Sequence, residues 1–142
     1  MPKLLPEEIA RKERKTVHLS LTEANYLGLP ESEDLPVYIS LKYFDGKHQC
    51  FSEWQHGELK SFTKFIEILR QQKWEEIKKN DGLKYKEHNR SKLPNKRILT
   101  LISPETTLFE LRVTQKARVH GFKVHSAFFL VWLDRNHDIY RQ

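Results

Sequence analysis

The last third of the chain constrains its fold most, because three strand-like runs follow one another with short polar connections. The runs span 108–113, 117–124 and 127–133. Their connections are too short to hold a crossover helix, so neighbouring strands must run antiparallel. The third run is almost wholly apolar, which is typical of a strand covered on both faces. The sequence therefore predicts an antiparallel meander at the centre of the domain.

An amphipathic helix precedes this meander. Apolar side chains recur at spacings of three and four, which places them on one face of a helix. They are Leu59, Phe62, Phe65, Ile66 and Leu69. This stripe is predicted to pack against the sheet, and Trp74 and Ile77 continue it in a further turn or in a separate short helix. The spacing of Ser52 and Gln55 is that of a capping box, which predicts the start of the helix there.

Two further segments carry strand signals. Residues 37–44 are β-branched and aromatic, and Asp45-Gly46 follows as a strong two-residue turn signal, so 47–51 is predicted as the returning strand of a hairpin. Residues 97–102 form another strand candidate. Between the helices and this candidate, residues 80–96 are polar without apolar periodicity, which favours a functional or mobile loop.

The chain of 142 residues is long enough for one domain. We expect an N-terminal extension over residues 1–35 and a domain over 36–142. The predicted fold class is α+β, with an antiparallel sheet of four or more strands and one or two helices packed on one face.

The charge and the cysteine content limit the class of partner. The chain has 25 Lys and Arg residues against 19 Asp and Glu, a formal charge of +6 that favours polyanionic partners. Cys50 is the single cysteine, so an intramolecular disulfide and Cys-rich zinc sites are excluded. No signal peptide and no apolar stretch of ~20 residues is visible. We therefore expect a cytoplasmic protein without a membrane partner.

The C-terminal half resembles the RelE/ParE toxin superfamily, including its HigB-like branch. Four features carry the resemblance: Phe109 to Val113 with an internal Leu-Arg pair, Lys116 to Val119 on the next strand, the apolar run Phe128 to Leu133, and the closing segment Asn136 to Arg141 with its His and Tyr. The resemblance covers about residues 52 to 142. Ala117 stands where an aromatic residue often precedes the strand arginine, and the N-terminal residues and the basic loop are not part of the minimal toxin fold.

The resemblance implies a toxin-like endoribonuclease, an mRNA interferase of a toxin–antitoxin system. Its implied partners are RNA, with the ribosome as a place of action, and a cognate antitoxin that covers the basic face. The alternative is a non-enzymatic binding module, either a gyrase inhibitor as in the ParE branch or an RNA-binding accessory protein. A host-interaction or phage protein that keeps only the fold is a third possibility.

Metal-free RNA cleavage needs a proton acceptor for the 2′-hydroxyl, cations for the phosphorane charge and an acid for the leaving 5′ oxygen. Arg118 is the expected transition-state stabiliser, because a guanidinium stays charged and grips phosphate through two nitrogens. His137, with an ordinary pKa near 6.5, is the expected proton-transfer group. Tyr140 is expected to bind the phosphate or to stack on a base. The resemblance implies the roles of His137 and Tyr140.

Further cations are expected to bind RNA phosphate, from the strands, the loop and the C-terminus. They are Arg112, Lys116, Lys84, Lys86, Arg90, Lys92 and Arg141. No cofactor and no metal is expected: His120, His125 and His137 match no known zinc spacing. The Asp134-x-Asn136-x-Asp138 pattern lacks the later glycine and glutamate of a calcium loop.

Overall fold

The computed structural model describes residues 34–94 and 96–140. All of them belong to one compact unit. The predicted N-terminal extension up to residue 33, and Arg141, lie outside the described residues. Within the described part, every helix is too short or too polar to cross a membrane.

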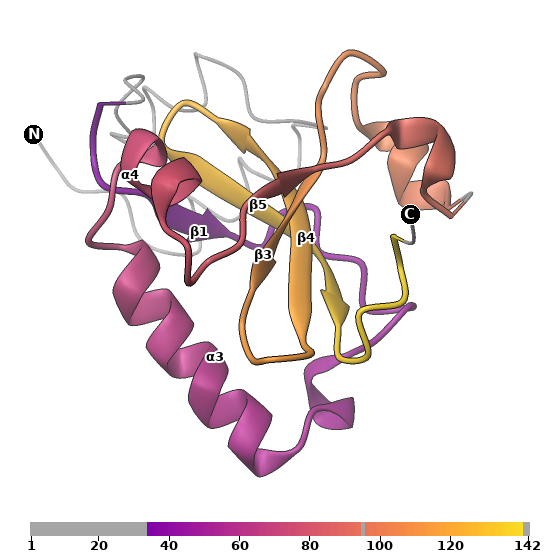
Figure 1. Ribbon diagram of the computed structural model, residues 1–142. Coiled ribbons are helices and arrows are strands. Elements are labelled where there is room, and N and C mark those ends of the chain that lie inside the picture. The colour runs from indigo at the N-terminus through magenta and orange to yellow at the C-terminus, as the bar shows by residue number, and fades with distance from the viewer. Residues whose placement is uncertain (1–33, 95, 141–142) are drawn as a thin grey trace, which may run out of the picture. The chain divides into compact units, whose positions relative to one another are not determined.

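The fold is α+β, as predicted: a five-stranded sheet carries two α-helices on one face (Figure 1). The strand order is β1-β5-β4-β3-β2. The strands are β1 (Tyr38–Ser40), β2 (Lys86–Glu87), β3 (Phe109–Arg112), β4 (Arg118–Val124) and β5 (Ala127–Asp134). The α-helices are α3 (His56–Leu69) and α4 (Trp74–Lys79), and three 3-10 helices span Phe51–Glu53, Arg90–Lys92 and Arg97–Leu101.

The predicted meander is confirmed. Strands β3, β4 and β5 pair antiparallel in sequence order, and every residue of β5 is buried between β1 and β4. A register shift follows His120, where the chain needs Gly121. A Cβ atom at Gly121 would lie only 2.0 Å from the carbonyl oxygen of Phe129. Glycine is therefore required there by the close approach of the neighbouring strand.

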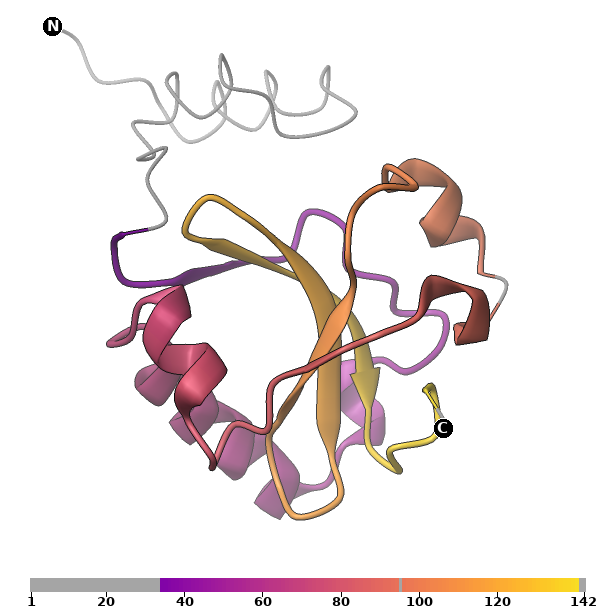
Figure 2. The same ribbon diagram turned by 45° about the horizontal axis from the view of Figure 1, so that its top comes forward.

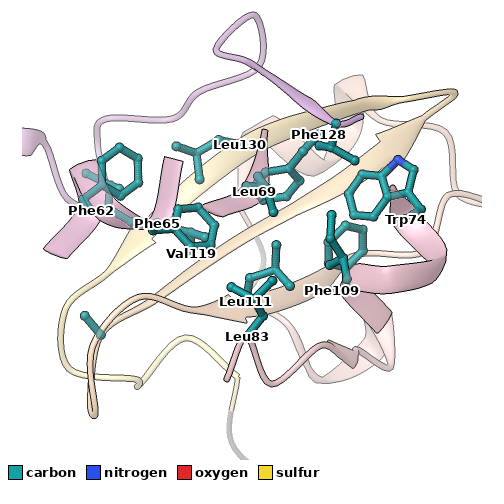
Figure 3. Close-up of a cluster of buried hydrophobic side chains, with 14 of the residues drawn as sticks. Phe62, Phe65, Leu69, Trp74, Leu83, Phe109, Leu111, Val119, Phe128 and Leu130 are labelled. Carbon is teal, nitrogen blue, oxygen red and sulfur yellow. The ribbon is translucent and has the colours of Figure 1, made fainter. Parts of the chain in front are cut away.

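The apolar stripe of α3 forms the core, as predicted. Phe62, Phe65 and Leu69 are buried against the sheet, together with Trp74 from the separate helix α4. Figure 3 shows these side chains meeting sheet residues such as Val119. They fill one face of the sheet with apolar atoms and leave polar groups to the other face.

The predicted helix start at Ser52 is wrong by one helical turn. Helix α3 begins at His56, and the carboxylate of Glu58 accepts a hydrogen bond from the backbone N–H of Gln55. Ser52 lies instead in the 3-10 helix Phe51–Glu53 that precedes it. An acid in the first turn stabilises a helix start, and Glu58 supplies it three residues after Gln55.

The predicted hairpin around Asp45 is also wrong. Strand β1 pairs in parallel with β5, and no strand follows over residues 47–51. Asp45 makes long-range contacts instead: its N–H donates to the carbonyl of Val131, and its Oδ2 accepts from Trp132 Nε1. These contacts fasten the turn to β5, so the sheet is mixed rather than wholly antiparallel.

The predicted strand at 97–102 is a 3-10 helix, Arg97–Leu101. The guanidinium of Arg90 donates to the carbonyls of Leu99, Ile102, Ser103 and Thr106. These carbonyls turn toward one cation and are not available for a strand ladder. The 3-10 helices Arg90–Lys92 and Arg97–Leu101 and the C-terminal end of the described residues lie on the side of the sheet opposite α3 and α4 (Figure 2).

Candidate functional site

Four ionisable side chains are buried together on this second face of the sheet. His88 follows β2, Glu110 lies in β3, His120 lies in β4, and Asp134 ends β5. Their exposed fractions are 7, 2, 0 and 0%. Charged side chains are rarely buried so completely unless they are paired, so this buried polar cluster is the strongest candidate for a functional site.

The strand register places these groups on one face. Glu110 lies directly opposite His120, and Arg118 lies directly opposite Asp134. Residues two apart on a strand share a face, so Arg118 and His120 point the same way. The apolar residues between them, such as Val119, face the helices instead. Alternation along β3, β4 and β5 thus separates an apolar face from a polar one.

A chain of hydrogen bonds joins three members of the cluster. Asp134 Oδ2 lies 2.7 Å from His120 Nε2, and His120 Nδ1 lies 2.8 Å from His88 Nε2. Asp134 also accepts hydrogen bonds from the backbone N–H groups of Asp138 and Ile139. Burial alone would raise the pKa of Asp134, but the hydrogen bond from His120 and these backbone donors hold it well below its usual value.

His88 is held neutral. Burial and then the neighbouring charges of His120 and Lys86 lower the pKa of His88 to about 3. The Tyr140 ring lies against the His88 ring at a centroid distance of 4.0 Å, and the Tyr140 hydroxyl accepts the backbone N–H of Asn89. The C-terminal segment therefore covers His88.

The two oxygens of Glu110 have different surroundings. Oε2 lies 2.8 Å from Nε2 of His137 and 3.4 Å from Nε of Arg118. Oε1 is buried and has no hydrogen-bond partner among the described residues, and Nε2 of His88 lies 3.8 Å from it. Glu110 thus connects the buried polar cluster with a more exposed histidine and an arginine.

Of the three predicted catalytic residues, Arg118 and His137 meet at Glu110, and Tyr140 lies beside His88. The His137 side chain is 34% exposed, and its backbone is left-handed, with φ 54°. Left-handed backbone is uncommon outside glycine and is enriched at functional sites. The Arg118 side chain is 11% exposed, and its Nη1 donates to the carbonyls of the 114–117 turn. Tyr140 is buried, with 8% of its surface exposed.

The predicted RNA-binding cations divide into two groups. Arg112 and Lys116 lie at the β3–β4 turn near Arg118, and Lys86 lies opposite Glu110 with its Nζ 5.5 Å from the Tyr140 ring centroid. Lys84 and Lys92 are exposed and form no hydrogen bond or ion pair with the cluster, and Arg90 is bound to the carbonyls described above. Arg141 lies outside the described residues.

Reasoning from the sequence missed Glu110, His88 and the role of Asp134. The signal was present in part, because Glu110 and His120 are polar residues at alternating positions of otherwise apolar strands. A polar residue inside such a run must be paired when it is buried. Periodicity alone did not show which polar positions of different strands lie opposite one another.

Two groups in the described part of the chain place possible metal ligands within 4.8 Å of one another. One consists of His88, Glu110 and His120, all buried, and the other of His48, Asp134 and Asp138. The trio of His120, His125 and His137 considered from the sequence is not among them.

Comparisons of the chain with models of protein families, with curated proteins and with solved structures found no match. Its function must therefore be inferred from the chemistry of these side chains.

Proposed function

We propose that this chain is a toxin-like endoribonuclease of the RelE/HigB kind, which cleaves RNA with His137 as the proton-transfer group. One observation carries the proposal: a partly exposed imidazole is hydrogen-bonded at 2.8 Å to a buried carboxylate. A carboxylate behind a histidine fixes the ring orientation and the tautomer, as general acid–base catalysis requires.

The two ring nitrogens of His137 then have separate tasks. Nε2–H donates to Glu110, which leaves the lone pair of Nδ1 for the substrate. Nδ1 accepts the 2′-hydroxyl proton as the 2′ oxygen attacks phosphorus. The bond from phosphorus to the 5′ oxygen breaks, that oxygen takes up a proton from water, and the proton held by Nδ1 passes to solvent. The products are a 2′,3′-cyclic phosphate and a 5′-hydroxyl, and Glu110 acts as a positioning residue.

Arg118 supports this site electrostatically. Its guanidinium compensates the charge of Glu110, with Nε 3.4 Å from Oε2, and its Nη1 donates to carbonyls of the 114–117 turn. The guanidinium is the group that we assign to the phosphorane oxygen. Lys86, on the same face, adds positive potential for RNA. We propose the antitoxin and the ribosome as partners of this basic surface.

The test compares purified wild type with His137→Gln and Arg118→Ala on RNA, with and without ribosomes. His56→Gln is the matched control, because His56 is exposed at the start of α3. We expect His137→Gln to lose about 100-fold or more in cleavage rate, the usual contribution of a positioned acid or base, and the control to keep it. If wild type leaves RNA intact under both conditions, or if His137→Gln cleaves equally fast, the proposal is wrong.

A non-enzymatic binding module is the second candidate. The observation that favours it is the limited exposure of Arg118 and Tyr140, since both are held by contacts within the protein. RNA that is bound but uncut by wild type would support an accessory RNA-binding protein. Loss of DNA supercoiling in expressing cells, with translation continuing, would support a gyrase inhibitor.

A further inference from the structure

We infer that His88, Glu110 and His120 form a binding site for one divalent transition-metal ion, with Zn²⁺ as the natural occupant. The ligand atoms of these three residues lie within 4.8 Å of one another, and all three side chains are buried. The inference goes beyond the proposed RNA cleavage, because the ion would lie behind His137 and take no part in the steps described above.

The carboxylate of Glu110 supplies the first argument. Its side chain is 3% exposed, and Oε1 has no hydrogen-bond partner among the described residues although Oε2 has two basic neighbours. A buried, charged oxygen without a partner is costly. A cation coordinated by Oε1 removes this cost, and Nε2 of His88 lies 3.8 Å from Oε1.

The two histidines supply the second argument. Nε2 of His88 lies 2.8 Å from Nδ1 of His120 and 3.8 Å from Oε1 of Glu110. Two atoms bound tetrahedrally to one ion at about 2.0 to 2.2 Å lie about 3.3 to 3.6 Å apart, between the two distances observed here. A single ion can therefore contact all three atoms after small movements of the side chains.

Asp134 supplies the third argument. It accepts the Nε2–H of His120 at 2.7 Å, which leaves the lone pair on Nδ1, the nitrogen that faces His88. A carboxylate behind a ligating histidine is the usual outer partner in zinc sites, because it fixes the tautomer and raises the basicity of the ligand. His137 holds Oε2 of Glu110 in a corresponding way.

The donor set determines the class of ion. Two imidazole nitrogens and one carboxylate oxygen suit Zn²⁺, Co²⁺, Ni²⁺ or Fe²⁺, whereas Mg²⁺ and Ca²⁺ prefer oxygen ligands alone. Glu110 and Asp134 bring two negative charges, and Arg118 and Lys86 bring two positive charges to the same face. The preference for an ion of this class therefore comes from the three donor atoms and not from a net negative charge. The ion would join β3, β4 and the segment after β2.

For the test, the full chain is treated with a chelator and then titrated with Co²⁺. The visible absorption bands of the bound ion report binding. We expect one Co²⁺ per chain and displacement by Zn²⁺. Glu110→Gln and His88→Gln should each weaken binding by at least tenfold, and Asp134→Asn by about 10- to 100-fold. Circular dichroism identifies any variant that does not fold. If His88→Gln or Glu110→Gln does not fold, Co²⁺ binding by the other one tests the site.

Two controls show whether the ion binds at this site or at another histidine. His56→Gln removes an exposed histidine, and His48→Gln removes the histidine of the second metal-ligand group. Both should bind Co²⁺ like wild type. Absence of binding by wild type, unchanged binding by folded His88→Gln and Glu110→Gln, or loss of binding in His48→Gln overturns the inference. The readout needs no RNA, so a chain that binds Co²⁺ without cleaving RNA contradicts only the proposed function.

Discussion

His120 and Asp134 form a completely buried histidine–carboxylate pair, with 2.7 Å between Nε2 and Oδ2. The pair joins β4 to the end of β5, and the same carboxylate binds the backbone of the C-terminal segment at Asp138 and Ile139. A single side chain thus orients a ring of the buried polar cluster and fixes the segment that carries His137 and Tyr140.

Replacing Asp134 by Asn should destabilise the protein. The amide keeps one acceptor oxygen but loses the charge, and its NH₂ group would face His120 or the backbone donors. We expect the free energy of unfolding to fall by about 1.5 to 3 kcal/mol, the usual contribution of hydrogen bonds to a charged group. Unfolding in urea, monitored by tryptophan fluorescence, measures this free energy. Asp138→Asn, at an exposed position, is the control, and equal effects of the two variants would contradict the role given to Asp134.

Gly121→Ala should prevent the sheet from closing. The added Cβ would lie 2.0 Å from the Phe129 carbonyl oxygen and 2.7 Å from the Phe128 ring, and neither backbone nor a buried ring can yield so far. We expect a loss of more than about 3 kcal/mol, or no folding. Gly57→Ala provides the contrast, because a Cβ there meets nothing within 4 Å. It should be neutral or stabilise α3 by up to ~1 kcal/mol. A normally stable Gly121→Ala protein would exclude the described strand pairing.

Arg90→Gln should loosen the 97–106 segment without a specific loss of RNA affinity. The guanidinium satisfies four carbonyls of this segment, and glutamine cannot reach them all. We expect faster amide hydrogen exchange over residues 97–106 and a free energy of unfolding lower by about 1 to 3 kcal/mol. Lys92→Gln, in the same 3-10 turn and exposed, should leave exchange unchanged. If amide exchange over residues 97–106 is as slow in Arg90→Gln as in wild type, the hydrogen bonds of Arg90 are not needed to order this segment.

Tyr140→Phe tests whether Tyr140 acts on the substrate or on the fold. The hydroxyl accepts the N–H of Asn89 at 3.0 Å, and the ring stays against His88 after the substitution. We expect a loss of about 1 kcal/mol in stability and less than a twofold change in RNA cleavage rate. A rate lower by tenfold or more in a folded variant would return Tyr140 to the catalytic role predicted from the sequence.

The wild type should lose stability in alkali partly through Tyr85. Burial, and then the hydrogen bond to Glu87, raise the pKa of Tyr85 well above its usual value. The folded state therefore keeps the phenol neutral while the unfolded chain ionises above about pH 10. The stability that the neutral Tyr85 phenol contributes is present below about pH 10 and is lost as the pH rises further. Tyr85→Phe should show a smaller fall in unfolding free energy between about pH 9 and pH 11 than wild type. If the unfolding free energy falls equally with pH in Tyr85→Phe and in wild type, the role given to Tyr85 is contradicted.

The sequence by itself determined the local structure that depends on periodicity. Short connections and alternation defined the β3–β5 meander, and spacings of three and four defined the buried stripe of α3. Both follow from neighbours within one element, so they can be read without knowing the rest of the chain. The convergence of Arg118 and His137 was also anticipated in part, because strand alternation and the C-terminal motif brought them to the same end of the meander.

The tertiary structure decided everything that depends on distant partners. Asp45 signals a hairpin locally, but its contacts with Val131 and Trp132 made β1 a parallel neighbour of β5 instead. The buried polar cluster likewise assembles His88 and Asp134, which are far apart in sequence, through strand register and a hydrogen bond between histidines. Local patterns give the propensity of a segment, whereas the pairing of buried charges is decided by which strands lie side by side.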